Sequence, residues 1–230
     1  MATHATEGAT RFAALWDRCV AQPASPPGSE VYAALAQRLG AADRRFHNLG
    51  HIDECLRQLD RVAALVRDRD AVELALWFHD AEYTPGDASN ERRSAELFVA
   101  LAAGAPVLLR RRVVGLILAT RHRKPARTHD RRYIEDIDLI GFGASWEKFM
   151  HNGDLLRAEF ASQPDRQYYA GQVAFLAMLE ARPVFFLTDY FRSRYEAQAK
   201  ANIRRLLALR AGEGYAPRPA GAARTPTSRS

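Results

Sequence analysis

The sequence has 230 residues, which is long enough to bury a large core in one domain. Its 33 Lys and Arg residues outnumber its 27 Asp and Glu residues, which gives a formal net charge of +6. This charge is compatible with an anionic small molecule or nucleic acid as partner but identifies neither, because net charge informs association rather than fold. No apolar run approaches the roughly 18 residues of a membrane span, so no membrane partner is expected.

The cysteine content and the first residues bear on the compartment. Cys19 and Cys55 are the two cysteines, and they lack the spacing of a metal-binding pair. Residues 1–10 carry no apolar segment of the kind found in signal peptides. We therefore expect a reduced, cytoplasmic protein.

Apolar residues recur at helical spacing through most of the chain, and no segment alternates as a strand does. Residues 1–10 are small and polar and are expected to be disordered, as is the Arg-, Pro- and Gly-rich tail at 211–230. Between them, the pattern predicts one all-α domain over residues 11–210. Its helices are expected from Phe12 to Val20, Ser29 to Leu39, His51 to Leu65, Asp70 (as the cap) to Phe78, Ser89 to Leu101, Pro106 to Arg121, Tyr133 to Ile140, Ser145 to Ala161, Pro164 to Arg182 and Val184 to Arg210.

The most informative stretch runs from Leu76 to Tyr83. Its helix is apolar on nearly every side and leaves only Glu73 for solvent, so it belongs in the interior. The helix ends in His79 and Asp80, and a buried carboxylate needs hydrogen bonds, an ion pair or a metal. An imidazole nitrogen and a carboxylate oxygen suit a divalent metal. The alternative is a core histidine held by the neighbouring acid.

Three further polar residues sit in otherwise apolar helical segments: His51, Asp136 and Asp138. Together with His79 and Asp80 they come from three separate helices. A helical bundle forms a metal site in this way, by pointing side chains from several helices inward.

The order His51, His79-Asp80, Asp138 resembles the metal-binding pattern of the HD-domain metal-dependent phosphohydrolase superfamily. Flanking segments are similar to one branch of it, the predicted metal-dependent HD phosphohydrolases, over roughly residues 12–208. The segments that carry this resemblance are Arg44-x-Phe46-His47-Asn48-x-x-His51-Ile52, Trp77-Phe78-His79-Asp80, Asn90-Glu91-x-x-Ser94-Ala95, Asp136-x-Asp138-Leu139, Arg157-x-Glu159-Phe160 and Glu196 to Asn202.

The resemblance implies an HD-type helical bundle that binds one divalent cation. The candidate metals are Mn, Mg, Co, Ni, Fe and Zn. The implied ligands are His51, His79, Asp80 and Asp138. Asp138 is preferred over Asp136 because the family ligand stands immediately before Leu. We expect Asp136 to orient a ligating histidine or a water instead.

The implied activity is hydrolysis of a phosphate ester, such as a nucleotide or nucleoside phosphate, by a metal-activated water. The candidate catalytic residues are Asp80, Glu82 and Glu91. The candidate substrate-binding residues are Arg44, His47, Asn48, Asn90 and His122. The plainer alternatives are a helix cap for Asn48 and for the Asn90-Glu91 pair, a structural role in the loop for His47, and a surface role for Glu82 and His122.

Two departures from the branch bear on substrate contacts: Phe46 stands where Tyr is usual, and Gln172 stands where Arg tends to occur. The basic stretch from Arg110 to Arg132 either solvates a face or draws an anionic substrate toward Asp138.

Two other functions remain as alternatives. One is a non-catalytic, metal-stabilised module that binds nucleic acid or protein through a basic face, although no nucleic-acid motif is present. The other is a di-iron oxygenase, for which His47, His122 and His129 would be the additional ligands. The expected partner is a small phosphate-containing anion, and a homodimer is compatible with the sequence.

Overall fold

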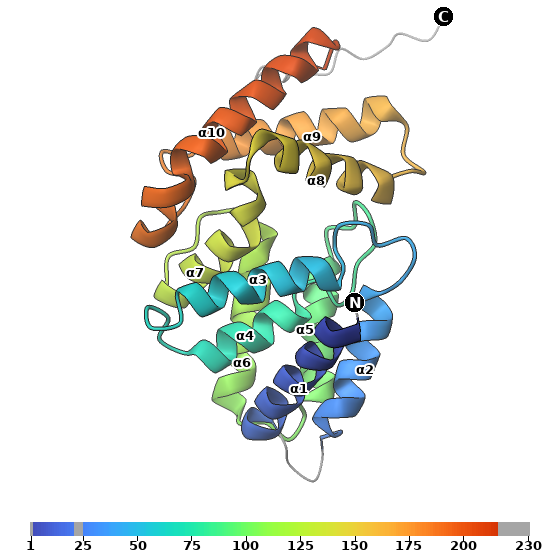
Figure 1. The fold of residues 1–230 in the computed structure, drawn as a ribbon, viewed down its shortest axis with the longest axis vertical. Coiled ribbons are helices and arrows are strands. Elements are labelled where there is room, and N and C mark those ends of the chain that lie inside the picture. The colour runs from blue at the N-terminus through green and yellow to red at the C-terminus, as the bar shows by residue number, and fades with distance from the viewer. Residues whose placement is uncertain (1, 21–24, 216–230) are drawn as a thin grey trace, which may run out of the picture.

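The computed structural model describes residues 2–20 and 25–215, and every regular element in these ranges is helical, as Figure 1 shows. The all-α prediction is therefore confirmed. The α-helices are α1 (Ala2–Cys19), α2 (Gly28–Leu39), α3 (Leu49–Arg61), α4 (Arg69–Phe78), α5 (Asn90–Leu101), α6 (Val107–Ile117), α7 (His129–Asp138), α8 (Trp146–Glu159), α9 (Asp165–Glu180) and α10 (Asp189–Gly212). Two 3-10 segments, η1 (Leu118–Arg121) and η2 (Leu139–Gly143), follow α6 and α7. None of the described helices combines the length and apolar character that crossing a bilayer requires.

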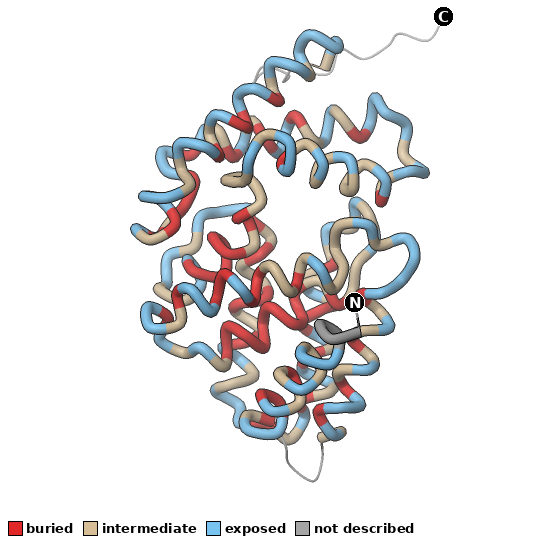
Figure 2. Tube along the Cα trace, in the orientation of Figure 1, coloured by how far each residue is buried: buried red, intermediate tan, exposed pale blue. Residues whose placement is uncertain are grey.

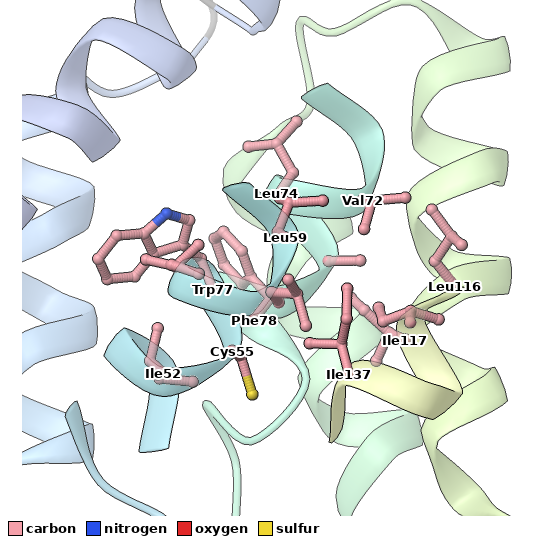
Figure 3. Packing of buried hydrophobic residues seen from close by; sticks show 14 of the residues in the cluster. Ile52, Cys55, Leu59, Val72, Leu74, Trp77, Phe78, Leu116, Ile117 and Ile137 are labelled. Carbon is pink, nitrogen blue, oxygen red and sulfur yellow. The ribbon is translucent and has the colours of Figure 1, made fainter. Parts of the chain in front are cut away.

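Helix α4 is the centre of the main core. Its residues from Ala71 to Phe78 are all buried, and it contacts α1, α3, α5, α6 and α7 (Figure 2). Figure 3 shows Trp77 and Phe78 among side chains from α3, α6 and α7. A helix that is apolar all round is stable only when other elements surround it, which explains this central position.

Two details of α4 differ from the sequence-based prediction. Its cap is Asp68, whose carboxylate accepts a hydrogen bond from the Ala71 amide at 3.0 Å, whereas Asp70 lies in the first turn and pairs with Arg18 at 2.7 Å. Glu73 does not face solvent. It is 5 % exposed and pairs with Arg11 of α1 at 2.6 Å, so the buried charge on this helix is neutralised from the neighbouring helix.

Helices α8, α9 and α10 form a second group, which lies above α3 and α7 in the view of Figure 1. The polar side chains of Glu196, which is half-buried, and Asn202, which is buried, join α10 to the segments before it. The Glu196 carboxylate accepts hydrogen bonds from the Phe185 and Phe186 amides, and the Asn202 amide donates to the Phe142 and Ala144 carbonyls of η2 and its end. We call α8, α9 and α10 the upper layer and the helices around α4 the lower layer.

The ends of the domain also differ from expectation. The first helix begins at Ala2, not near Phe12, so residues 2–10 are helical where disorder was expected. Within this segment Gly8 lies against Tyr32 and Trp77, where an added Cβ would be 3.2 Å from the Tyr32 hydroxyl. At the other end α10 extends to Gly212, and the remaining expected tail from 216 to 230 lies outside the described residues.

Candidate metal centre

The two histidines that the resemblance implied as ligands lie within 3.6 Å of each other and of both implied carboxylates. His51 comes from the first turn of α3, His79 and Asp80 follow α4, and Asp138 ends α7. His51 Nε2 lies 3.2 Å from His79 Nε2, 3.2 Å from Asp138 Oδ1 and 3.6 Å from Asp80 Oδ2. His79 Nε2 lies 3.0 Å from Asp80 Oδ2 and 3.4 Å from Asp138 Oδ1.

These separations match the edges of a coordination polyhedron. Donor atoms that each lie about 2.1 Å from one cation are about 3.0 Å apart at octahedral angles and about 3.4 Å apart at tetrahedral angles. Two imidazoles and two carboxylates are also a donor set that divalent transition metals accept. The residues present therefore fit a divalent cation in both spacing and chemistry.

A backbone contact orients His79 toward the cluster. Its Nδ1 lies 2.8 Å from the Leu76 carbonyl oxygen, which can only accept a hydrogen bond, so Nδ1 carries the proton. In the neutral ring, Nε2 then presents its lone pair to His51, Asp80 and Asp138. This tautomer is the one that a ligating histidine needs.

The imidazoles and carboxylates of the cluster shift one another's pKa values. Burial alone would raise the pKa of the Asp138 carboxyl, but the His79 and His122 rings outweigh it and hold this pKa well below its ordinary value. The pKa of Asp80 is likewise lowered, because His79 and His47 outweigh burial. Burial would lower the pKa of His79, but the Asp80 and Asp138 carboxylates hold it well above its usual range. The carboxylates are thus ionised and strongly attract positive charge.

His122 supports Asp138 from the side. Its Nε2 lies 2.8 Å from Asp138 Oδ2, and its Nδ1 lies 3.5 Å from Glu135 Oε1. Burial lowers the pKa of His122, but the Asp138 and Glu135 carboxylates outweigh it and raise the pKa to about 9. A protonated His122 holds one Asp138 oxygen and leaves Oδ1 directed at His51 and His79. The residue was predicted to bind substrate, and the structure adds this positioning contact.

Cys55 also borders the cluster, although the sequence gave it no site role. Its Sγ lies 3.7 Å from His51 Nε2, and it groups with His51 and Asp138 at metal-ligand spacing. Burial, together with the charges of Asp138 and Asp80, raises the pKa of this thiol well above its ordinary value. Cys55 is therefore a neutral thiol that packs in the apolar core labelled in Figure 3.

Two residues that were predicted to bind substrate form hydrogen bonds to the backbone next to the candidate ligands. The Arg44 guanidinium donates hydrogen bonds to the carbonyl oxygens of Asp80 and Ala81. The Asn48 side chain accepts from the Gly50 and His51 amides and caps α3, as its alternative interpretation held. Both residues fix the segments that carry ligands.

His47 is held by a residue of the upper layer that the sequence analysis assigned no role. The Glu159 carboxylate of α8 accepts hydrogen bonds from the amides of Phe46 and His47 at 2.8 and 2.9 Å, and its other oxygen lies 2.7 Å from His47 Nδ1. Burial would lower the pKa of His47, but the charges of Asp80 and Glu159 raise it. Glu159 thereby ties the loop before α3 to α8.

A cavity of about 390 Å³ reaches the cluster between the two layers. The cluster side of its lining includes His47, Asp80, Glu91, His122 and Asp138. Asn90 also lines the cavity, and its side chain exchanges hydrogen bonds with the backbone of Thr84. Glu91 lies 3.6 Å from Arg121 as an ion pair. We call this cavity the cleft.

Two predicted site residues point elsewhere. Glu82 does not line the cleft and pairs with Arg38 of α2 at 3.1 Å, because the chain turns after Phe78 and directs the next side chains differently. Asp136 does not orient a ligand: its carboxylate accepts hydrogen bonds from the Leu187 amide and from the amide and hydroxyl of Thr188. Burial raises the pKa of Asp136 to about 7 despite these bonds.

The basic stretch lies mostly away from the cleft. Arg112 pairs with Asp68, and Arg121 borders both the cleft and a separate cavity of about 550 Å³. The other cations around that second cavity are Arg123, Lys124, Arg127 and Arg131. His129, a candidate second-iron ligand, does not line the cleft and lies 2.8 Å from Asp130.

Comparison with known proteins adds no relative. No protein-family model, curated protein or solved structure matches this chain. The site is therefore characterised by its own geometry.

Proposed function

We propose that the protein is a metal-dependent phosphohydrolase that uses one divalent cation at His51, His79, Asp80 and Asp138. The observation that carries this proposal is the convergence of these four side chains at separations of 3.0–3.6 Å from three helices. The resemblance to HD-domain phosphohydrolases, which rests on the same residues in the same order, supports it independently of the geometry.

The reaction is addition of water to the phosphorus of an ester. The water oxygen forms a new P–O bond, the P–O bond to the alcohol breaks, and the alcohol departs with a proton that comes from the water. When bound, a divalent cation would lower the pKa of the attacking water and polarise a phosphoryl oxygen. The chain's own residues supply the placement of both reactants.

Asp80 is suited to two tasks, because one carboxylate can both bind the cation and orient a water. Its Oδ2 faces the cluster, and its side chain also lines the cleft. The Arg44 guanidinium donates a hydrogen bond to the backbone carbonyl of Asp80, which restrains the residue that carries this carboxylate. We assign Asp80 as the group that positions the attacking water. Glu82, which pairs with Arg38 and does not line the cleft, has no role in this proposal.

The cleft wall beside the cluster offers groups of both signs. His122 is cationic near neutral pH, since Asp138 and Glu135 raise its pKa to about 9. His47, from the loop before α3, lines the same cleft. His47 holds Glu159 through Nδ1, so its Nε2 can donate to a phosphoryl oxygen as negative charge develops there. The two nitrogens of His122 face Asp138 and Glu135, so this ring contributes its positive charge rather than a hydrogen bond to the substrate. Glu91 can accept a proton in the same space, where Arg121 balances its charge. A nucleotide or nucleoside phosphate as substrate rests on the family resemblance alone.

A hydrolysis screen tests the proposal. Purified protein loaded with Mn, Mg, Co or Ni is assayed for phosphate release from a panel of nucleotides and simple phosphate esters. We expect Asp138→Ala to lower the rate by at least about 100-fold, because it removes a ligand and not merely the outer support of one. The matched control is Glu82→Gln, which changes a nearby acid outside the cleft and should keep the wild-type rate. Absence of phosphate release from every ester with every metal would overturn the proposal.

A further inference from the structure

The wall of the cleft opposite the cluster is unusually apolar for a site that handles phosphate. Upper-layer helices contribute Phe149 and Phe160 from α8 and its end, and Tyr168, Phe175 and Leu176 from α9. Phe142 of η2 links these side chains, with its ring centroid 5.6 Å from that of Phe149 and 6.5 Å from that of Phe175. Apolar surface that lines a cavity beside convergent polar groups is typical of a small-molecule site.

This surface is not all hidden by the protein itself. Phe175 is 38 % exposed although it belongs to the aromatic group around Phe142. Phe142, Phe160 and Met150 are half-buried and line the same cavity. Aromatic rings in such a position can stack with, or pack edge-on against, another ring.

Both arginines that line the cleft are already held by other side chains. The two arginines that line it are Arg121 and Arg210. Arg121 faces Glu91 at 3.6 Å, and Arg210 is held by Gln172 at 2.8 Å and by Glu213 at 2.6 Å. Arg123, Lys124, Arg127 and Arg131 of the basic stretch line the second cavity, not the cleft. A chain of several phosphates would therefore lie against apolar rings without matching charge, which costs free energy.

We propose that the substrate is a monophosphate ester whose alcohol carries an aromatic ring system, with the phosphate at the cluster and the ring between Phe142, Phe160 and Phe175. This inference rests on the proposed function and names its substrate class. The alcohol portion leaves as a free aromatic alcohol or nucleoside after the P–O bond breaks. The volume of about 390 Å³ lies near the lower end of the roughly 300–1,000 Å³ range of ligand pockets.

Binding of phosphonates separates the inference from catalysis, because the P–C bond does not hydrolyse. Calorimetry on the metal-loaded wild-type protein compares methylphosphonate with benzylphosphonate and 1-naphthylmethylphosphonate. We expect the aromatic ligands to bind about tenfold or more tightly, since burying a ring removes apolar area from water. Equal affinities for methyl and aromatic ligands would overturn the inference.

Variants locate the ring. Phe175→Ser should weaken naphthylmethylphosphonate binding by about fivefold and leave methylphosphonate binding unchanged, because only the ring contact is lost. Phe175→Tyr should restore the aromatic preference. The matched control is Leu108→Ser, which removes an apolar side chain that is 75 % exposed on α6 and lies outside the cleft. A loss in Leu108→Ser equal to that in Phe175→Ser would contradict this placement.

The hydrolysis panel then distinguishes the two proposals. Both proposals stand if 1-naphthyl phosphate or a nucleoside monophosphate is hydrolysed at least tenfold faster than glycerol phosphate and ATP. Whichever of these two esters reacts faster then shows whether the substrate is an aryl or a nucleoside phosphate. Preference for glycerol phosphate or ATP would overturn the aromatic monophosphate while leaving the phosphohydrolase intact. Aromatic selectivity in phosphonate binding without any hydrolysis would support the ring site and overturn the phosphohydrolase.

Discussion

The two layers of the molecule are held together by different physical means. In the lower layer α4 is surrounded by apolar side chains, and the ligand pair His79 and Asp80 emerges at its end. In the upper layer, buried side chains such as Glu159 and Asn202 bind the backbone of distant segments. Apolar packing is non-directional, whereas a hydrogen bond to a backbone amide fixes position and direction.

The difference assigns separate tasks to the two layers. Packing around α4 makes the end of that helix rigid, which suits ligands that must keep their spacing for a cation. The upper layer carries the opposite wall of the cleft, and a few polar contacts set its distance from the cluster. Damage to the lower layer should therefore reduce stability and metal binding together, while damage to the upper contacts should change the cleft more than the cluster.

The largest effect on stability is expected from Phe78→Ala in the lower layer. Phe78 is fully buried and its ring lies 5.2 Å from that of Phe98 and 6.0 Å from that of Trp16. Loss of the ring should lower the free energy of unfolding by about 3–5 kcal/mol. Phe175→Ala in the upper layer is the matched comparison, and because this ring is partly exposed it should cost about 1 kcal/mol or less. Urea unfolding measures both, and equal losses would remove the proposed difference between the layers.

A smaller loss is expected from Glu159→Ala, which breaks the contact between the layers. The substitution leaves the Phe46 and His47 amides without their acceptor and removes the partner of the His47 ring. Unfolding free energy should fall by about 2–3 kcal/mol, because orphaned buried donors carry a desolvation cost. Metal affinity should fall by about tenfold at most, less than for a ligand variant. Glu147→Ala, an exposed acid on the same helix, is the control and should match the wild type in both measurements.

The same contact predicts a pH dependence. The pKa of Glu159 is lowered, because the hydrogen bonds and charge of His47 outweigh burial, and the pKa of His47 is raised. The stabilising contribution of the pair should thus be complete above about pH 5 and below about pH 6.5, and should be lost as pH rises through the raised pKa of His47. With metal chelated, the difference in melting temperature between wild type and Glu159→Gln should shrink from pH 6 to pH 9. A difference that grows with pH would show that this sign is wrong.

The smallest effect is expected from Cys55→Ala. If the thiol only packs beside the cluster, the variant should bind as much metal as the wild type and lose about 1 kcal/mol of stability from the small cavity. Metal analysis and urea unfolding of the same preparation test both parts. A fall in bound metal would instead make Cys55 a ligand together with His51 and Asp138.

The His79-Asp80 pair could be predicted to be buried together because its signal is local, whereas His51 and Asp138 were implied as its partners by the family resemblance. A helix that is apolar on all sides and ends in His79-Asp80 has to deliver polar groups to the interior, and the structure brings His51 and Asp138 to the same point. Helical periodicity also predicted most elements, since each helix buries a regular set of apolar positions. It missed the start of α1, where Gly8 of a polar segment lies against Tyr32 of α2 and Trp77 of α4.

The roles of the acids could not be predicted in the same way. Glu159 acts on a residue 112 positions away, and helical periodicity carries no information about such a partner. The only sequence signal was its place in the segment Arg157-x-Glu159-Phe160. Glu82 pairs with Arg38 and Asp136 binds the Leu187 amide, contacts that the sequence did not indicate, because closeness to a ligand along the chain does not fix side-chain direction once the helix turns or ends. The aromatic wall needed the structure, since its rings come from α8, α9 and η2.

Metal content is the most direct test of the central claim, that His51, His79, Asp80 and Asp138 together hold one cation. The experiment compares the wild-type protein with Asp138→Ala and Glu82→Gln. Each is equilibrated with Mn, Co, Ni and Zn in turn, freed of excess ion and analysed by plasma mass spectrometry. Circular dichroism confirms that each protein is folded. The account predicts about one cation per chain in the wild type and in Glu82→Gln, and close to none in a folded Asp138→Ala. A wild type that retains no cation, or an Asp138→Ala variant that retains as much as the wild type, would contradict it.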